Sequence, residues 1–102
     1  MASMIIVTGR LTARPESFDA LLDLSLQHVH RSREERGCIL HSVQRDVEDP
    51  LTLVFFEKWS DLAALQAHFE VSGDFVRRAA ELSAQPGTLE VFDATLVPVA
   101  GA

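Results

Sequence analysis

The sequence predicts an α+β fold in which one antiparallel sheet carries its helices on one face. Extended and helical patterns alternate along the chain in the order β-α-β-β-α-(α)-β. That order is the split β-α-β arrangement of the ferredoxin-like fold. The first and last strands are also apolar on both faces, although the helices cover only one. An uncovered apolar face marks a partner surface, so we expect a homodimer packed sheet against sheet.

Length and composition indicate one ordinary globular domain. The chain has 102 residues, of which 47% are hydrophobic and 24% charged, and we expect the domain to span residues 4–98 with flexible ends at 1–3 and 99–102. The formal charge of −6 argues against nucleic acid and anionic membranes as partners. Cys38 has no second cysteine to pair with, and neither a membrane-span pattern nor a signal-peptide pattern occurs. We therefore expect a cytoplasmic protein.

The first third of the chain reads as a strand followed by a long helix. Residues 4–11 alternate, with Ile5 and Val7 on one strand face. Pro15 suits the first turn of a helix expected over residues 16–36, and Gly37 suits the position after it, where a positive φ is needed. The apolar stripe of this helix consists of Phe18, Leu21, Leu22 and Val29, with Leu26 beside it.

Two more strands are predicted next, with a polar turn between them. Residues 38–45 form the first, and the acidic, proline-containing stretch 46–50 is typical of a turn. The second strand begins at Leu51 and leads directly into a helix, for which Ser60 is the expected N-cap. On the first strand, one face is expected to carry Ile39, His41 and Val43; on the helix, the apolar stripe is expected to be Leu62, Leu65 and Phe69.

The last third predicts a further helix and a closing strand. Residues 72–74 break the preceding helix and can cap the next one. Pro86 and Gly87 mark a turn before a strand over residues 88–99. Buried positions on the helix are expected at Phe75, Val76, Ala79 and Leu82. The strand should carry Leu89, Val91 and Val97 on one face and Phe92, Ala94 and Leu96 on the other.

The corner between the strand and the helix of residues 51–69 is the expected functional crevice. Glu57 and Trp59 leave the strand on the same face, and His68 lies at the edge of the helix's apolar stripe. Imidazole titrates near neutral pH, so His68 is a candidate acid-base group, and His41 is a second one. The structural alternatives are a histidine bonded to backbone or water, a packed indole and a paired buried carboxylate. His28 and His30 point to nearly opposite sides of their helix, so no metal pair is expected.

The stretch "RGCILHSVQRDVEDPLTLVFFEKWSDLAALQAHF" resembles the core of the antibiotic biosynthesis monooxygenase family, and the likeness extends from residue 4 to residue 98. The resemblance implies ferredoxin-like dimers that oxygenate phenols and quinols without metal, flavin or haem. The family also contains haem-degrading proteins, but residues 75–79 offer no histidine ligand for haem. The matching pieces are Gly37-Cys38, Asp46, Glu48-Asp49-Pro50, Glu57, Trp59, Leu65, Ala67-His68, Ser72 and Phe75.

The resemblance implies a function and a role for each candidate residue. The expected activity is cofactor-independent oxidation of a small phenol or quinol by dioxygen, with His68 as the base and His41 as a second acid-base or orienting group. The alternatives are an isomerase or lyase that works by proton transfer on a small carbonyl compound, and a non-catalytic dimeric binding domain. The substrate is expected to contact Trp59, Glu57, Phe55 and Phe75.

Three structural outcomes separate these alternatives. An open crevice with both histidines inside favours an enzyme. A crevice filled by Trp59, Phe69 and Phe75 favours a binding domain. Arg10 and Arg45 converging on the crevice would favour a phosphate-bearing substrate.

Overall fold

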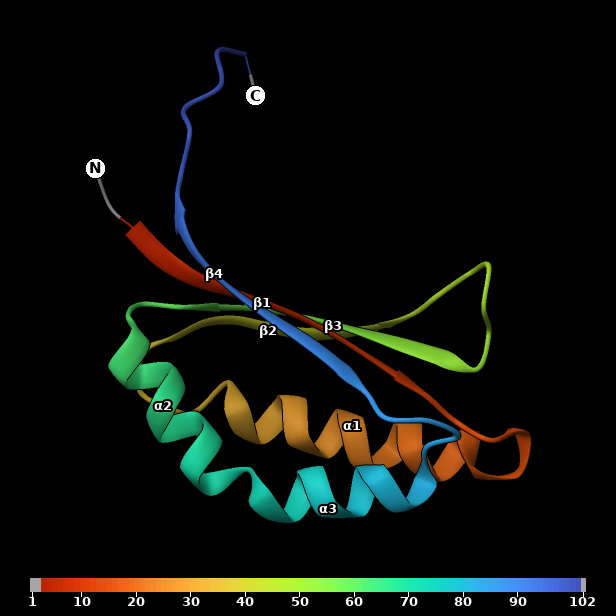
Figure 1. Ribbon diagram of the computed structural model, residues 1–102. Coiled ribbons are helices and arrows are strands. Elements are labelled where there is room, and N and C mark those ends of the chain that lie inside the picture. The colour runs from red at the N-terminus through yellow and green to blue at the C-terminus, as the bar shows by residue number, and fades with distance from the viewer. Residues whose placement is uncertain (1–2, 102) are drawn as a thin grey trace.

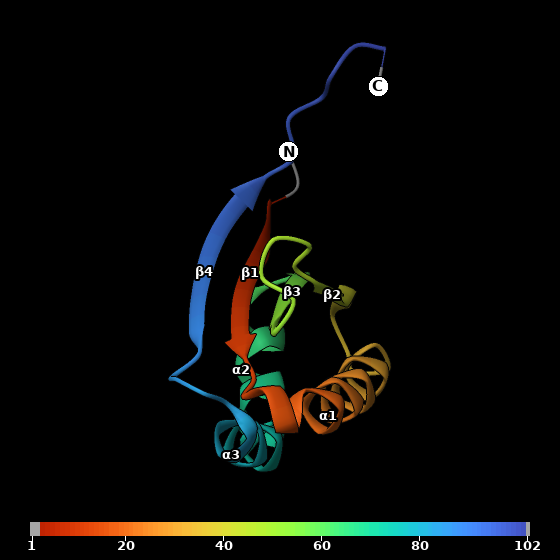
Figure 2. The same cartoon turned by 90° about the vertical axis from the view of Figure 1, so that its right-hand side faces the viewer.

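The computed structural model describes residues 3–101; of the predicted flexible ends, residues 1, 2 and 102 lie outside this range. Four antiparallel strands form one sheet in the order β2-β3-β1-β4, and all helices lie on one side of it (Figures 1 and 2). This is the predicted ferredoxin-like α+β fold. The strands are β1 (Ser3–Thr12), β2 (Cys38–Arg45), β3 (Thr52–Trp59) and β4 (Thr88–Thr95).

The helical layer contains three α-helices and one short 3-10 turn. The turn η1 (Pro15–Ser17) leads into α1 (Phe18–Ser32), and α2 (Leu62–Val71) and α3 (Gly73–Leu82) follow β3. None of the helices within residues 3–101 has both the length and the apolar character needed to span a bilayer. The core between the layers consists of Ala13, Phe18, Leu21, Leu24, Val29, Leu53, Phe55 and Ala79, with a second cluster of Ile5, Val7, Trp59 and Leu65.

The sheet face away from the helices carries the apolar cluster that the sequence predicts, interrupted by polar positions such as Thr8, Lys58 and Glu90. The register sets Ile6 opposite Phe92 on one side and Lys58 on the other, and paired residues share a face. The neighbouring even-numbered positions therefore lie on this same open face. It includes Met4, Ile6, Val54, Phe56, Phe92 and Ala94, all half-buried or exposed in the single chain.

The first helix ends four residues before the predicted end at Arg36. After Ser32 the backbone amides of Glu34 and Glu35 bond to carbonyls three residues back, at 3.1 and 3.0 Å, instead of four. Such bonds tighten the last turn and end the α-helix. Gly37 then has φ of +84°, which agrees with the predicted helix-ending role.

Two strand predictions are wrong because the pairing of neighbouring strands, and not sequence alternation alone, sets the direction of a side chain and the end of a strand. A bulge between Cys38 and Leu40 shifts the register of β2, so Ile39 is exposed and does not share the face of His41. The strand β4 ends at Thr95, opposite Ser3, where the described part of β1 begins. Leu96 and Val97 therefore lie beyond the strand.

Three predictions for α2 and α3 are also wrong. Asp61, not Ser60, caps α2, because its Oδ1 accepts from the amide of Ala64 at 2.8 Å. Leu62 and Phe69 lie exposed while Leu65 and His68 are buried, so the stripe that faces the sheet is partly polar. On α3, Val76 is exposed and Ala79 is buried.

Candidate active site

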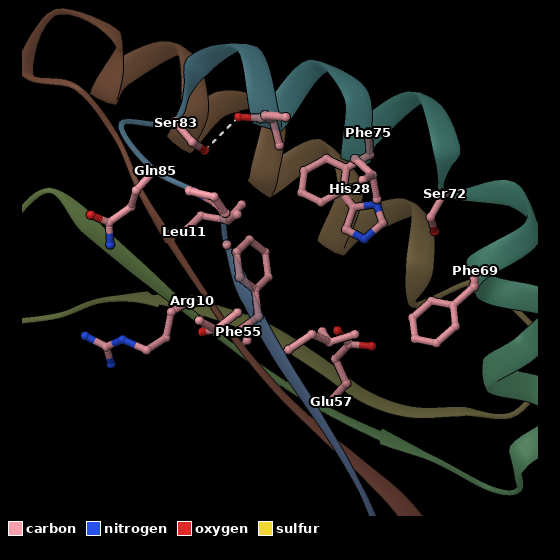
Figure 3. A pocket seen from close by; sticks show the side chains of 18 of the residues that line it. Arg10, Leu11, His28, Phe55, Glu57, Phe69, Ser72, Phe75, Ser83 and Gln85 are labelled. Atoms are coloured by element: carbon pink, nitrogen blue, oxygen red, sulfur yellow. Dashed lines mark hydrogen bonds between the residues drawn. The ribbon is translucent and has the colours of Figure 1, made fainter.

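An open cavity of about 650 Å³ lies between the β1–β4 half of the sheet and the helices α2 and α3 (Figure 3). Its volume is in the range of small-molecule sites. Most of its wall is apolar, and titratable side chains gather at one end. Residues of the apolar wall include Leu11, Phe55, Phe69, Phe75, Val76, Ala79 and Leu89; the polar end holds His28, Glu57, His68 and Ser72.

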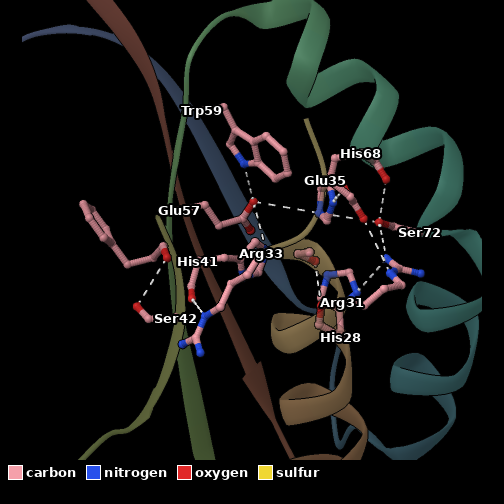
Figure 4. A network of polar contacts seen from close by, with 12 residues as sticks. His28, Arg31, Arg33, Glu35, His41, Ser42, Glu57, Trp59, His68 and Ser72 are labelled. Carbon is pink, nitrogen blue, oxygen red and sulfur yellow. Dashed lines mark hydrogen bonds and ion pairs between the residues drawn. The ribbon is translucent and has the colours of Figure 1, made fainter. Parts of the chain in front are cut away.

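A carboxylate holds the ring of His68 at this polar end. Glu35 Oε1 lies 2.7 Å from His68 Nδ1, and the His68 side chain is almost completely buried (Figure 4). An ionised carboxylate only accepts hydrogen bonds, so Nδ1 carries the donated proton and the lone pair of the neutral ring is on Nε2. Ser72 Oγ lies 3.4 Å from that Nε2 but donates its own hydrogen to the His68 carbonyl oxygen at 2.6 Å. The lone pair of Nε2 therefore remains available to a bound molecule.

Arg31 on α1 fixes the carboxylate and ties α1 to the end of α2. Its Nη1 donates to the carbonyl oxygen of Val71 at 3.1 Å, and its Nε lies 3.5 Å from Glu35 Oε2. The tight turn after Ser32 brings Glu35 into this position. The positions of His68 and its carboxylate partner are thus set by the junction of α1, α2 and β2.

Glu57 is a buried carboxylate in the cavity wall. Trp59 Nε1 donates to Glu57 Oε1 at 2.9 Å, and His41 Nε2 lies 3.3 Å from the same oxygen. Burial on its own would raise the pKa of Glu57, but the contacts with His41 and Trp59 outweigh it, so this pKa lies below its ordinary value. Glu57 is therefore ionised at neutral pH, 3.9 Å from His68 Nε2.

Three histidine rings surround this carboxylate end of the cavity. The ring centroids of His28, His41 and His68 lie 5.1 to 5.4 Å from one another. His28 also stacks on Phe75, with centroids 3.8 Å apart and the planes 7° from parallel. Burial, followed by the neighbouring His68 and His41 rings, lowers the pKa of His28 to about 3, so this ring is neutral at pH 7.

Comparison with known proteins identifies the family. The family model for antibiotic biosynthesis monooxygenase matches residues 4–75. The chain belongs to this family. YcnE of Bacillus subtilis, whose name proposes a monooxygenase, is 31% identical over 85 residues, covering 81% of this chain and 90% of YcnE. A crystal structure of an antibiotic biosynthesis monooxygenase superposes with a TM-score of 0.82 at 30% identity, covering 90% of this chain and 99% of that one.

A further relative is longer than this chain. The Synechocystis protein sll1783, named as uncharacterized, is 31% identical over 90 residues. The match covers 86% of this chain and 61% of that protein. The relatives thus fix the family and the fold, while activity and substrate remain matters for proposal.

The structure brings four of the six predicted site residues to the cavity wall and two behind it. Phe55, Glu57, His68 and Phe75 line the cavity. Trp59 and His41 are fully buried and contact Glu57 instead, so neither lines the cavity.

Sequence reasoning missed three residues of this family member's site, namely His28, Arg31 and Glu35. A signal for His28 was present, because it lies seven residues after Leu21 and four after Leu24, on the buried stripe of α1. A polar ring at a stripe position is a candidate for a site. Glu35 lies seven residues after His28, but no local pattern indicates that it meets His68, 33 positions away.

Two further expectations concerned arginines converging on the crevice and aromatic rings filling it. Arg10 lines the cavity, but its Nη2 pairs with Asp46 at 2.7 Å. The guanidinium of Arg45 lies over the Phe18 ring. Within the described residues these two arginines do not converge on the cavity, and the rings of Phe69 and Phe75 leave it open.

Proposed function

We propose that this member of the family is a monooxygenase that oxidises a small phenol or quinol with dioxygen and needs no cofactor for that reaction. The observation that carries the proposal is the Glu35–His68 pair at the polar end of an apolar cavity. A base held by a carboxylate beside an aromatic-lined space fits a substrate that has one acidic hydroxyl on an apolar ring.

The reaction begins with transfer of the phenolic proton to His68 Nε2. Glu35 stabilises the imidazolium that forms, because its carboxylate already accepts from Nδ1 at 2.7 Å. The phenolate then supplies the electrons that reduce dioxygen, and a carbon–oxygen bond forms at an unsubstituted ring carbon. The His68 imidazolium returns its proton to the outer peroxide oxygen, which regenerates the base. Loss of water from the resulting hydroperoxide leaves a quinone, so phenol plus O₂ balances to quinone plus H₂O.

The remaining wall residues position the ring and exclude water. Phe55 and Phe75 present aromatic faces to the cavity, and Val76 and Ala79 complete its apolar side. Glu57 is ionised and 3.9 Å from His68 Nε2, so it can accept from a second hydroxyl of a quinol. His41 contributes indirectly, by its contact with Glu57.

We also propose that the protein is a homodimer built on the open face of the sheet. Ile6 and Phe92 lie side by side on that face, and Phe92 is 45% exposed in the single chain. Exposed apolar clusters of this kind are typical of obligate interfaces, which commonly bury on the order of 2,000 Å² or more.

Oxygen uptake tests the function. Chelator-treated protein should consume oxygen with at least one member of a panel of phenols and quinols. Under the same conditions His68→Ala should lower the rate about 10²- to 10⁴-fold, the usual contribution of a general base. His41→Ala should cost less, because the ring contacts Glu57 but does not line the cavity. The matched control is His30→Ala, an exposed histidine on α1, which should keep the parent rate.

Two results would contradict the proposal. Full turnover by a folded His68→Ala variant would show that the base lies elsewhere. Deuterium exchange at a carbon beside a carbonyl, with no oxygen uptake on any panel member, would favour the isomerase or lyase alternative, for which the adjacent Glu57 carboxylate is a second acid-base group.

A further inference from the structure

We propose that His28, His41, His68 and Glu57 form a binding site for a divalent transition-metal ion, with zinc as the representative ion. The inference goes beyond the proposed function and does not depend on it. The three ring nitrogens that could bind an ion all lie within 4.8 Å of one another. The three residues come from α1, β2 and α2, so the fold, not local spacing, brings them together (Figure 4).

The spacing of the donor groups is close to that of a tetrahedral site. Zinc–nitrogen bonds of about 2.0–2.1 Å place neighbouring donor atoms roughly 3.3 Å apart and imidazole centroids roughly 5 Å apart. The centroids of the three rings are 5.1 to 5.4 Å apart, and His41 Nε2 lies 3.3 Å from Glu57 Oε1. His68 Nε2 lies 3.9 Å from the same oxygen. Ring rotation that brings the nitrogens, now within 4.8 Å of one another, to roughly 3.3 Å would close the set around one ion. For His28 to bind through Nε2, Arg31 Nη2 must give up its 3.3 Å contact with Nδ1, because a guanidinium only donates and Nδ1 must then carry the ring proton.

The ring of His41 supplies an independent reason to expect a ligand. It is 1% exposed, and within the described residues neither of its nitrogens has a hydrogen-bond partner. Buried polar groups are rarely left without a partner, because the lost hydration is not replaced. The contact of His41 with Glu57 lacks the alignment of a hydrogen bond, whereas a shared ion would satisfy both groups.

The surroundings already have the features of an outer shell around a metal site. Glu35 accepts from His68 Nδ1, the carboxylate–histidine arrangement that fixes the ring and leaves Nε2 for the ion. Trp59 Nε1 orients Glu57 by donating to its Oε1 at 2.9 Å. Phe75 holds the plane of His28 by stacking.

The open cavity gives an ion a route to these ligands. His28, His68 and Glu57 line it, and His41 lies directly behind Glu57. Three imidazoles and one carboxylate are the donor set that zinc and its neighbours in the first transition row accept, in preference to calcium or magnesium.

Metal binding would use the same lone pair that the proposed oxygenase mechanism needs. An ion on His68 Nε2 prevents that atom from accepting a phenolic proton. Zinc should therefore inhibit oxygen uptake while it binds. Binding and turnover are separate measurements, so failure of one proposal is distinguishable from failure of the other.

Equilibrium dialysis of the chelator-treated full-length protein against zinc, read by elemental analysis, tests the site. We expect one zinc per chain, and an affinity at least about 100-fold weaker in His28→Phe and in His41→Phe, because even outer-shell changes cost 10- to 100-fold. His28→Phe keeps a ring stacked on Phe75, and His41→Phe replaces a ring that has no hydrogen bond. Each variant therefore has its own reason to fold, and one folded variant is enough for the test. The control His30→Ala removes an exposed histidine and should bind like the parent.

Each outcome decides the inference. One zinc per chain, lost in a folded His28 or His41 variant and kept in His30→Ala, supports it. No stoichiometric zinc on the parent, or equal binding by all four proteins, overturns it. Zinc that binds in this pattern and raises oxygen uptake would support the site and contradict the cofactor-free mechanism.

Discussion

The two halves of the helix side of the sheet differ sharply. At the β2–β3 half, Trp59 and His41 are 0% and 1% exposed, covered by α1 and α2. At the β4 edge, Leu89 and Val91 are 54% and 44% exposed, although the register places them on the same face as Gly9 and Val7. One half is packed and contains charged groups, while the other is open and apolar.

The difference explains where a reactive site can form. At the packed half, burial lowers the pKa of His28, and the contacts with His41 and Trp59 lower the pKa of Glu57 in spite of its burial. The packing also holds the rings in fixed positions. The open half gives access and an apolar wall. His68 lies at the boundary between the two, which is where a base can be both held by a carboxylate and reached by a substrate.

The largest expected effect concerns the opposite, uncovered face. Phe92→Asp places a carboxylate on the proposed dimer interface, where a twofold axis would repeat it. A buried unpaired charge costs about 3–5 kcal/mol, so the variant should be monomeric and less stable. Sedimentation at micromolar concentration distinguishes the monomer from the dimer. Val47→Asp, in the exposed turn between β2 and β3, is the control and should remain a dimer. A monomeric parent protein would contradict the proposed dimer.

The next largest effect breaks the packed half at one backbone position. A Cβ on Gly37 would lie 2.5 Å from Ala64 Cβ and 2.7 Å from Ser60 Oγ, and its φ of +84° is strained for any other residue. Gly37→Ala should therefore lower the free energy of unfolding by about 3 kcal/mol, from strain and overpacking together. Denaturant unfolding measures this.

Gly73→Ala is the matched control for that substitution. Among the described residues, no atom lies within 4 Å of a Cβ built on Gly73, which opens α3 with an ordinary φ. The change should be neutral or stabilise the protein by up to about 1 kcal/mol. Equal losses at both positions would show that the packed half is not the more sensitive one.

Sequence patterns predicted the fold well because the ferredoxin-like order needs only the sequence of strand and helix periods. The details failed where tertiary pairing decides. The bulge at β2 turned Ile39 outward, and the tight turn after Ser32 brought Glu35 to His68. Glu35 lies 33 positions from its partner, so local spacing could not join them. The place of His68 in the cavity wall was predictable, because its residue type, its helix position and the family pattern agree.

Acid should weaken the packed half through His28. Burial lowers the pKa of His28 to about 3, whereas an unfolded chain would have its ordinary 6.5. Between these values the unfolded state binds more protons than the folded state, so stability falls as the pH falls. The expected loss is about 2 kcal/mol between pH 7 and pH 5.

Comparison of chemical unfolding at the two pH values, in the parent and in His28→Phe, isolates this contribution. The variant should lack that part of the loss. Glu57, whose pKa is also lowered, removes stability in the same direction but at lower pH, as the solution approaches the folded-state pKa. A parent and variant with the same pH dependence would show that His28 is not buried in its neutral form.

The smallest expected effect distinguishes two adjacent residues at the start of α2. Asp61 Oδ1 accepts from the amide of Ala64 at 2.8 Å, and this bond satisfies one of the free N–H groups that open the helix. Asp61→Ala should cost about 1 kcal/mol, the usual value for a lost N-cap. Ser60→Ala, at the position the sequence favoured, should cost less than about 0.5 kcal/mol, as an exposed substitution without a capping bond. Although α2 carries His68, fraying of its first turn should leave oxygen uptake nearly unchanged. His68 lies two turns further along the helix. A larger loss from Ser60→Ala than from Asp61→Ala in thermal unfolding would return the cap to Ser60 and move the start of α2 by one residue.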